Sequence, residues 1–233
     1  MRIASKTASL VYKVALAVLG TAALLAQAGV FSGAIDPSFF HMFTHISNIA
    51  VVAYLWCAAL ALASGRVAAG TPWLGPVKHA LMLAIMVTCL IAHFMLNGGM
   101  VFAGGKFFWT MLVMHYVVPM GMVADWLLFD DKGTMTWKEP PTWTLFPLAY
   151  VALVFAAVLG LGASFGASGT GDAALDATGF GNSRWPYPFL NIDTLGVPAV
   201  LGFIAAMVVA FIALGYVFVV VDHALARRSS ARS

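Results

Sequence analysis

Six stretches of this chain are apolar over a length that can cross a lipid bilayer as a helix. The hydrocarbon core of a bilayer is ~30 Å thick, and roughly 20 helical residues span it. The stretches are continuously apolar, whereas membrane-spanning strands alternate apolar and polar residues. They run approximately over residues 10–31, 37–63, 76–96, 106–129, 143–163 and 197–222. The sequence therefore predicts an all-α integral membrane bundle of six transmembrane helices.

The composition agrees with a membrane protein. Only 9% of the residues are charged and 62% are hydrophobic, whereas an ordinary soluble domain is about 25% charged. Six spans and their short connections occupy nearly the whole chain and leave no room for a separate soluble domain. We therefore expect a single membrane domain over residues 1–233.

The positions of lysine and arginine predict the orientation, because the cytoplasmic loops of membrane proteins are enriched in both. If the N-terminus is cytoplasmic, all 12 Lys and Arg residues except Lys106 and Arg184 lie on the cytoplasmic side. This asymmetry predicts that both termini are cytoplasmic in a multi-pass protein of the inner (plasma) membrane. The net charge of +3 reflects topology and gives no evidence for nucleic-acid binding, because the basic residues are scattered over the inner loops.

A histidine inside an apolar segment is the strongest functional signal. An ionisable side chain within a bilayer is costly, so it usually faces protein or a water-filled cavity and marks function. His115 lies nine residues past Lys106, about 13 Å below the outer end of its span. Thr44 lies seven residues past Pro37, about 10 Å below the outer end of another span. We therefore expect Thr44 and His115 to meet at one depth.

Thr44 and His115 together suggest nucleophilic catalysis. A threonine hydroxyl is a poor nucleophile until a base accepts its proton, and a neutral imidazole is the usual base near neutral pH. The pair predicts a nucleophilic site in a pocket toward the outer leaflet. A threonine in a membrane helix more often bonds its own backbone or packs against a neighbour, so Thr44 alone is a weak signal.

Further polar and aromatic residues cluster toward the same end of the spans, or in the aromatic segment 185–189. They are the candidates for contacts with a lipid substrate or with a developing oxyanion. Of these, Phe43 and Trp109 are equally plausible as packing residues. The candidates are Phe43, Ser47, Asn48, His93, Asn97, Trp109, Trp185 and Tyr187.

Two other functions use the same residues. His45, His93 and His115 lie on three segments, and facing imidazoles at matched depth hold haem in membrane cytochromes. The expected depths of His93 and His115 differ by about 7 Å, so this hypothesis ranks below hydrolysis, and no metal or other cofactor is predicted. The same polar cluster also fits a lipid or small-molecule binding or transport protein without catalysis. Asp125, near an inner end, would reach water or a basic partner.

Three short motifs resemble a known family. They are Phe43-Thr44 followed by Ser47-Asn48, Met114-His115 followed by Pro119, and Trp185-Pro186-Tyr187-Pro188-Phe189-Leu190 before the last span. Their order and spacing are similar to those of the androgen-induced and androgen-dependent membrane hydrolases, in a bacterial branch, and the similarity covers essentially the whole chain. Tyr-Pro-Phe is the most specific element.

The resemblance implies a six-helix intramembrane hydrolase. Animal members of that family cleave esters that join a fatty acid to the hydroxyl of another fatty acid, with a threonine nucleophile and a histidine partner. By motif, these roles fall on Thr44 and His115. The chain departs from the animal proteins in the position of Pro119 and in the segment 164–184, which resembles an addition. The reaction class therefore transfers better than the substrate.

Overall fold

The computed structural model of the chain describes residues 2–33, 35, 37–96, 108–165 and 184–230. The regular elements of this part are helices, and six helical segments are long and apolar enough to cross a bilayer, which confirms the predicted fold class. The six segments are α1 (Lys6–Gln27), α2 (Phe43–Ala63), α3 (Gly75–Phe94), α4 to α5 (Phe108–Phe129), α6 to η5 (Glu139–Gly160) and α10 (Val197–Ser230).

Two of these segments are composite. The fourth consists of α4 (Phe108–Leu112), the π-helical turn η4 (Val113–Val117) and α5 (Val118–Phe129). The fifth consists of α6 (Glu139–Trp143), α7 (Leu145–Phe155) and the π-helical turn η5 (Ala156–Gly160).

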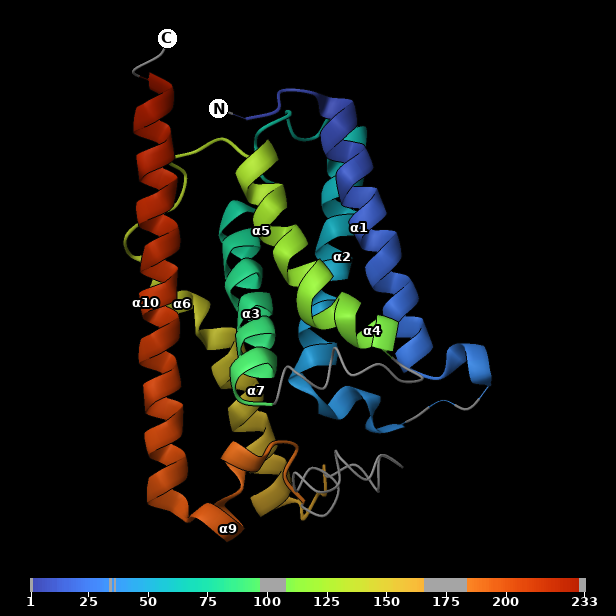
Figure 1. Cartoon of the computed structure of the whole chain (residues 1–233), viewed down its shortest axis with the longest axis vertical. Coiled ribbons are helices and arrows are strands. Elements are labelled where there is room, and N and C mark those ends of the chain that lie inside the picture. Colours follow the sequence, from blue (N-terminus) through green and yellow to red (C-terminus); the bar gives the residue numbers. More distant parts are fainter. Residues whose placement is uncertain (1, 34, 36, 97–107, 166–183, 231–233) are drawn as a thin grey trace.

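Helix α3 lies in the middle of the bundle (Figure 1). One apolar core fills the space between α3 and the helices α1, α2 and α5, with Leu16, Leu55 and Met122 among its buried members. A second core joins α3 to α6, α7 and α10. The first residues of α1 and the last residues of α10 lie at the same end of the bundle (Figure 1). We call this the termini end and the other the opposite end.

Helix α2 begins later than the sequence predicts. The expected start was Pro37, but Pro37–His41 form the short 3-10 helix η2, and Met42 is extended with φ −93° and ψ 134°. The α-helix starts at Phe43, so Thr44 lies in its first turn instead of two turns inside it. The expected depth of Thr44 along its helix was therefore wrong.

The last span follows a compact segment, residues 184–196, which contains η6 (Pro188–Leu190) and α9 (Ile192–Leu195). Asn191 caps α9, because its Oδ1 accepts hydrogen bonds from the amides of Asp193 at 3.0 Å and Thr194 at 3.2 Å. The buried Leu190 belongs to the core shared by α3 and α10. This packing places the aromatic part of the segment against the bundle.

Candidate functional site

Thr44 and His115 lie within hydrogen-bonding distance of each other. Oγ1 of Thr44 is 3.3 Å from Nε2 of His115, although 71 residues separate them in the sequence. Both side chains are buried, with exposed fractions of 9% and 5%. The spacing is slightly longer than the 2.6–3.2 Å of a nucleophile and its base, which are often further apart without substrate.

The second ring nitrogen of His115 determines its tautomer. Nδ1 lies 3.0 Å from the carbonyl oxygen of Met111. A carbonyl only accepts hydrogen bonds, so Nδ1 carries the proton of the neutral ring. Nε2 then holds the lone pair, and the Thr44 hydroxyl donates to it. This is the arrangement that a general base requires.

His115 occupies the centre of the π-helical turn η4. Such turns are wider than an α-helical turn and are frequent at functional sites. Pro119 explains the irregular backbone, because proline has no amide hydrogen and its ring clashes with the carbonyl four residues earlier. For Pro119, that residue is His115 itself. The local sequence therefore places the imidazole at a distortion of the helix.

Ser47 and Asn48 hold the backbone of Thr44 in position. The hydroxyl of Ser47 donates to the carbonyl oxygen of Thr44 at 3.1 Å, and Nδ2 of Asn48 donates to the same oxygen at 2.8 Å. Nδ2 of Asn48 also donates to the carbonyl oxygen of Met114 at 3.2 Å. Because Met114 precedes His115, Asn48 links helix α2, which carries Thr44, to the π-helical turn η4, which carries His115. Both Ser47 and Asn48 are fully buried.

Tyr187 lies against the first turn of α2. Its hydroxyl oxygen accepts a hydrogen bond from the backbone amide of Phe43 at 2.9 Å. It is also hydrogen-bonded to the backbone and the side chain of Thr44 and to the hydroxyl of Tyr150. Burial raises the pKa of Tyr187 above its ordinary value, so the phenol keeps its proton at neutral pH. The tyrosine thereby satisfies amide hydrogens that a helix leaves unpaired at its start.

An apolar cavity of about 80 Å³, measured as the space open to the centre of a water-sized sphere, adjoins Thr44 and is partly open to the outside. Its walls come from α2, α3, α7, the 184–196 segment and α10, and no charged side chain is among them. They comprise Phe43, Thr44, Val87, Thr88, Ile91, Leu96, Thr144, Pro147, Leu148, Tyr150, Val151, Tyr187, Phe189, Leu190, Phe203, Ile204, Met207, Val208 and Phe211. Thr44 therefore lies between the cavity and His115.

The segment that carries Tyr187 is held by an ionic contact. Arg184 donates to both carboxylate oxygens of Asp193 at 2.7 Å, and Nε1 of Trp185 donates to Oδ2 at 2.8 Å. These hydrogen bonds, from Arg184 first, lower the pKa of Asp193 to about 2. Trp185 is buried at 1% exposure and packs on Phe155 of α7. Its role here is to anchor the segment rather than to line the cavity.

The structure places other candidates away from the cavity. His93 is exposed, and its Nδ1 lies 3.0 Å from the hydroxyl of Tyr116. Trp109 is 43% exposed and is not among the cavity residues. Asn97 lies outside the described residues. Of the remaining candidates, Phe43 and Tyr187 line the cavity with Thr44, whereas Ser47 and Asn48 support the Thr44 backbone.

The histidines considered for haem have separate partners. His45 stacks on Phe39, and its Nδ1 is 2.5 Å from the Phe39 carbonyl oxygen. His93 pairs with Tyr116, and His115 has both ring nitrogens engaged. Among the described residues, no group of three His, Cys, Asp or Glu side chains is arranged to hold a metal ion. No observation thus favours the haem hypothesis.

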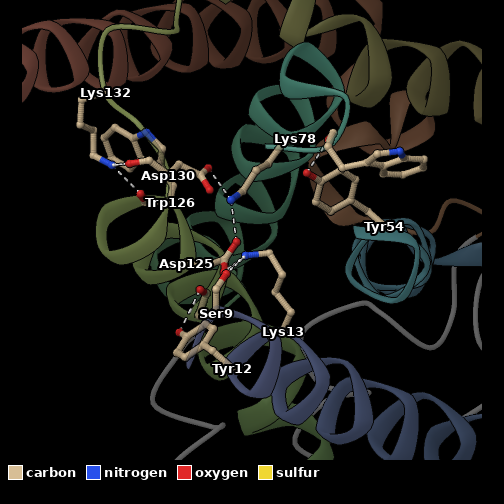
Figure 2. Close-up of polar contacts among 11 residues, drawn as sticks. Ser9, Tyr12, Lys13, Tyr54, Lys78, Asp125, Trp126, Asp130 and Lys132 are labelled. Atoms are coloured by element: carbon tan, nitrogen blue, oxygen red, sulfur yellow. Dashed lines mark hydrogen bonds and ion pairs between the residues drawn. The ribbon is translucent and has the colours of Figure 1, made fainter. Parts of the chain in front are cut away.

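A network of buried ion pairs lies toward the termini end of the bundle. The sequence predicted only that Asp125 reaches water or a basic partner. Lys78 contacts Asp125 at 2.6 Å and Asp130 at 2.5 Å, and Lys13 contacts the second oxygen of Asp125 at 2.7 Å (Figure 2). Asp125 has the predicted basic partners, but it reaches them inside the protein, because Lys78 and Asp125 are fully buried. The sequence did contain a signal for this contact, because Lys78 and Asp125 carry opposite charges and lie on two different apolar segments.

Comparison of the chain with protein-family models, with curated proteins and with solved structures returns no match.

Proposed function

We propose that the chain hydrolyses lipid esters within the membrane, with Thr44 as nucleophile and His115 as general base. One observation carries this proposal: Oγ1 of Thr44 lies 3.3 Å from the unprotonated Nε2 of His115 on the wall of an apolar cavity. A hydroxyl paired with a neutral imidazole is the minimal unit of acyl transfer. The resemblance of the three motifs to the membrane hydrolases points to the same reaction class.

In the first half of the reaction, Oγ1 of Thr44 attacks the ester carbonyl carbon while its proton moves to Nε2 of His115. The π electrons of the carbonyl move to its oxygen and form a tetrahedral oxyanion. Collapse of this intermediate re-forms the carbonyl and breaks the bond to the alcohol oxygen. Nε2 returns the proton to that oxygen, so the alcohol leaves and an acyl-Thr44 ester remains.

In the second half, Nε2 of His115 accepts a proton from water, and the resulting hydroxide oxygen attacks the acyl carbon. The tetrahedral intermediate collapses with cleavage of the bond to Oγ1. The proton on Nε2 passes to Oγ1, which regenerates the Thr44 hydroxyl and releases a fatty acid. The Met111 carbonyl holds the protonated Nδ1 throughout, so the imidazole keeps its orientation.

The cavity supports an acyl chain as the group bound beside Thr44. Its lining contains no charged side chain and consists mainly of aliphatic and aromatic groups, as expected for a site that binds hydrocarbon. The resemblance makes a fatty-acid ester of a hydroxy fatty acid the first substrate to test. Phe203 of α10 lines the cavity and is 44% exposed, which supports entry of the lipid from the bilayer.

The test is hydrolysis of a panel of lipid esters by the purified full-length chain, together with its Thr44→Val and His115→Asn variants. Thr44→Val keeps the side-chain shape and removes the hydroxyl, so we expect turnover to be abolished. Thr44→Ser should retain measurable turnover. Thr21→Val is the matched control, because among the described residues the Thr21 hydroxyl bonds only the Ala17 carbonyl and the Trp56 indole.

Mass spectrometry of the denatured protein after a brief reaction should show an acyl group on Thr44. Turnover that persists in both Thr44→Val and His115→Asn would overturn the proposal. The same cavity also supports lipid binding without catalysis. That alternative predicts that wild type and Thr44→Val bind an ester equally and that neither forms a product. The haem hypothesis is tested separately, because an absorption spectrum of the same sample would reveal a haem.

A further inference from the structure

We infer that the hydroxyl of Tyr187 is the hydrogen-bond donor that stabilises the oxyanion formed on attack by Thr44. This inference rests on the proposed hydrolase function and assigns a catalytic residue within it. Tyr187 and Thr44 line the same cavity, and the Tyr187 hydroxyl is bonded to the first residues of α2.

The direction of the Tyr187 hydrogen bond follows from a count of protons. Nδ1 of His115 holds the ring proton against Met111, so the single hydroxyl proton of Thr44 points to Nε2. Oγ1 of Thr44 can therefore only accept from Tyr187, to which it is hydrogen-bonded. The Tyr150 oxygen is a second acceptor for the Tyr187 proton, because Tyr150 is also hydrogen-bonded to Tyr187 and donates its own proton to the His41 carbonyl. The single Tyr187 proton is therefore shared between the oxygen atoms of Thr44 and Tyr150, and in the first of these orientations it points at the reacting oxygen.

The surroundings of the Tyr187 oxygen make its proton a strong donor. The oxygen accepts from the amide of Phe43 at 2.9 Å and from the backbone of Thr44. Hydrogen bonds received by a hydroxyl polarise the one that it donates, and the start of a helix carries positive partial charge. The amides that donate to the Tyr187 oxygen draw electron density toward themselves. The Tyr187 hydroxyl hydrogen therefore becomes a stronger hydrogen-bond donor.

Other donors near Thr44 are committed elsewhere. Both hydrogens of the Asn48 amide are donated to carbonyl oxygens, those of Thr44 and Met114. The Ser47 hydroxyl bonds the Thr44 carbonyl and the Thr88 hydroxyl. The indole of Trp185 donates to Asp193. Among the described donor side chains in the predicted set, Tyr187 is the one that can direct its hydrogen at Oγ1 of Thr44.

The role of Tyr187 requires no proton transfer. As the bond between Oγ1 and the carbonyl carbon forms, negative charge leaves Oγ1 and collects on the carbonyl oxygen one bond away. The hydrogen bond from Tyr187 moves from Oγ1 to that oxygen, and the phenol keeps its proton. When the intermediate collapses, the hydrogen bond returns to Oγ1. Such a bond is stronger in the transition state than in the ground state and so lowers the barrier.

The test compares wild type with Tyr187→Phe in the full-length chain, using methylumbelliferyl laurate as substrate. Loss of one oxyanion donor typically lowers kcat by about 10²–10³-fold, and we expect a decrease of that size with KM changed less than about threefold. Tyr12→Phe is the matched control, because within the part of the chain that the structure describes the Tyr12 hydroxyl bonds only the Gly121 carbonyl, at 3.0 Å.

An oxyanion role is separated from a helix-capping role by two inhibitors. A dodecyl trifluoromethyl ketone forms a tetrahedral adduct with a nucleophilic hydroxyl, whereas lauramide remains trigonal. We expect Tyr187→Phe to weaken the ketone by the same factor as kcat and to leave lauramide binding unchanged. Equal weakening of both, or a kcat within threefold of wild type, would overturn the inference.

If Tyr187→Phe does not fold, difluorotyrosine introduced at position 187 keeps the hydroxyl and makes it more acidic. Turnover should then be retained near neutral pH and should disappear at a lower alkaline pH than in wild type, because the ionised phenol cannot donate. An unchanged alkaline limb would contradict the role of Tyr187. Turnover that survives Thr44→Val would instead reject the hydrolase proposal itself, so the two failures are distinguishable.

Discussion

The ammonium group of Lys78 on α3 lies 2.6 Å from one carboxylate oxygen of Asp125 on α5. The other oxygen of Asp125 accepts a hydrogen bond from Lys13 on α1 at 2.7 Å. One buried carboxylate therefore connects three helices (Figure 2). Lipid tails are as apolar as leucine, so apolar surface alone does not select which helices meet in a bilayer. This network provides a specific link at the termini end.

We predict that Asp125→Asn destabilises the folded bundle. Removing one partner of a buried ion pair leaves uncompensated charge and costs about 3–5 kcal/mol. Arg2→Gln is the control, because it breaks the exposed Arg2–Asp131 pair, whose side chains are 30% and 49% exposed, and exposed pairs contribute about 0–1 kcal/mol. Denaturant unfolding in detergent micelles measures both. Equally small changes in the two variants would contradict a stabilising role for the network.

The cavity predicts a dependence on acyl-chain length. Ile204 lines it from α10, and Ile204→Trp should fill part of the space. If two methylenes of the laurate chain no longer fit in the cavity, the lost burial costs about 0.8 kcal/mol for each. We then expect kcat/KM for methylumbelliferyl laurate to fall by about 10-fold. The value for the butyrate ester should be nearly unchanged, because its chain is short. Leu201→Trp is the control, because Leu201 is 56% exposed and outside the lining. An equal loss for both esters would argue against this site for the chain.

The Arg184–Asp193 contact is expected to survive mild acid. The pKa of Asp193 is lowered to about 2, below the ~3.9 of an unfolded aspartate. A lowered carboxyl pKa contributes stability above the unfolded value and loses it as the pH falls through the folded value. Hydrogen exchange of the 184–196 segment, corrected for intrinsic rates, should therefore not change between pH 7 and pH 5. Asp193→Asn should raise the exchange rate at both pH values, and protection that weakens already near pH 5 would contradict this assignment.

The distribution of Lys and Arg predicts which end of the bundle is cytoplasmic. Ser32 and Thr134 are exposed; Ser32 lies in η1 (Val30–Ser32), which follows α1, and Thr134 lies in the connection that follows α5. The last residues of α1 lie at the opposite end and those of α5 at the termini end (Figure 1). In a background with Cys57→Ala and Cys89→Ala, we expect a membrane-impermeant maleimide to label Ser32→Cys in intact cells. Thr134→Cys should be labelled only after permeabilisation. The reverse pattern would invert the topology and place the cavity toward the cytoplasm.

The amino-acid sequence by itself determined the six spans, because the length of an apolar stretch is a local property that the bilayer thickness selects. It also singled out Thr44 and His115, since polar groups are costly in lipid and stand out among apolar neighbours. It misplaced the start of α2. The amide of Phe43 is satisfied by Tyr187, 144 residues away in the sequence, and a local pattern does not contain that partner.

Only the tertiary structure decided which of the other polar residues lie in contact and which apolar residues line the cavity. Lys78 and Asp125 are 47 residues apart. The sequence predicted that Asp125 reaches water or a basic partner, and it did not identify Lys78 as that partner. Ile204 lines the cavity while Leu201 on the same helix faces outward. In lipid, a cavity wall, a helix contact and a lipid-facing surface all favour the same apolar residues. The packing of the helices therefore distinguishes them, and the residue type does not.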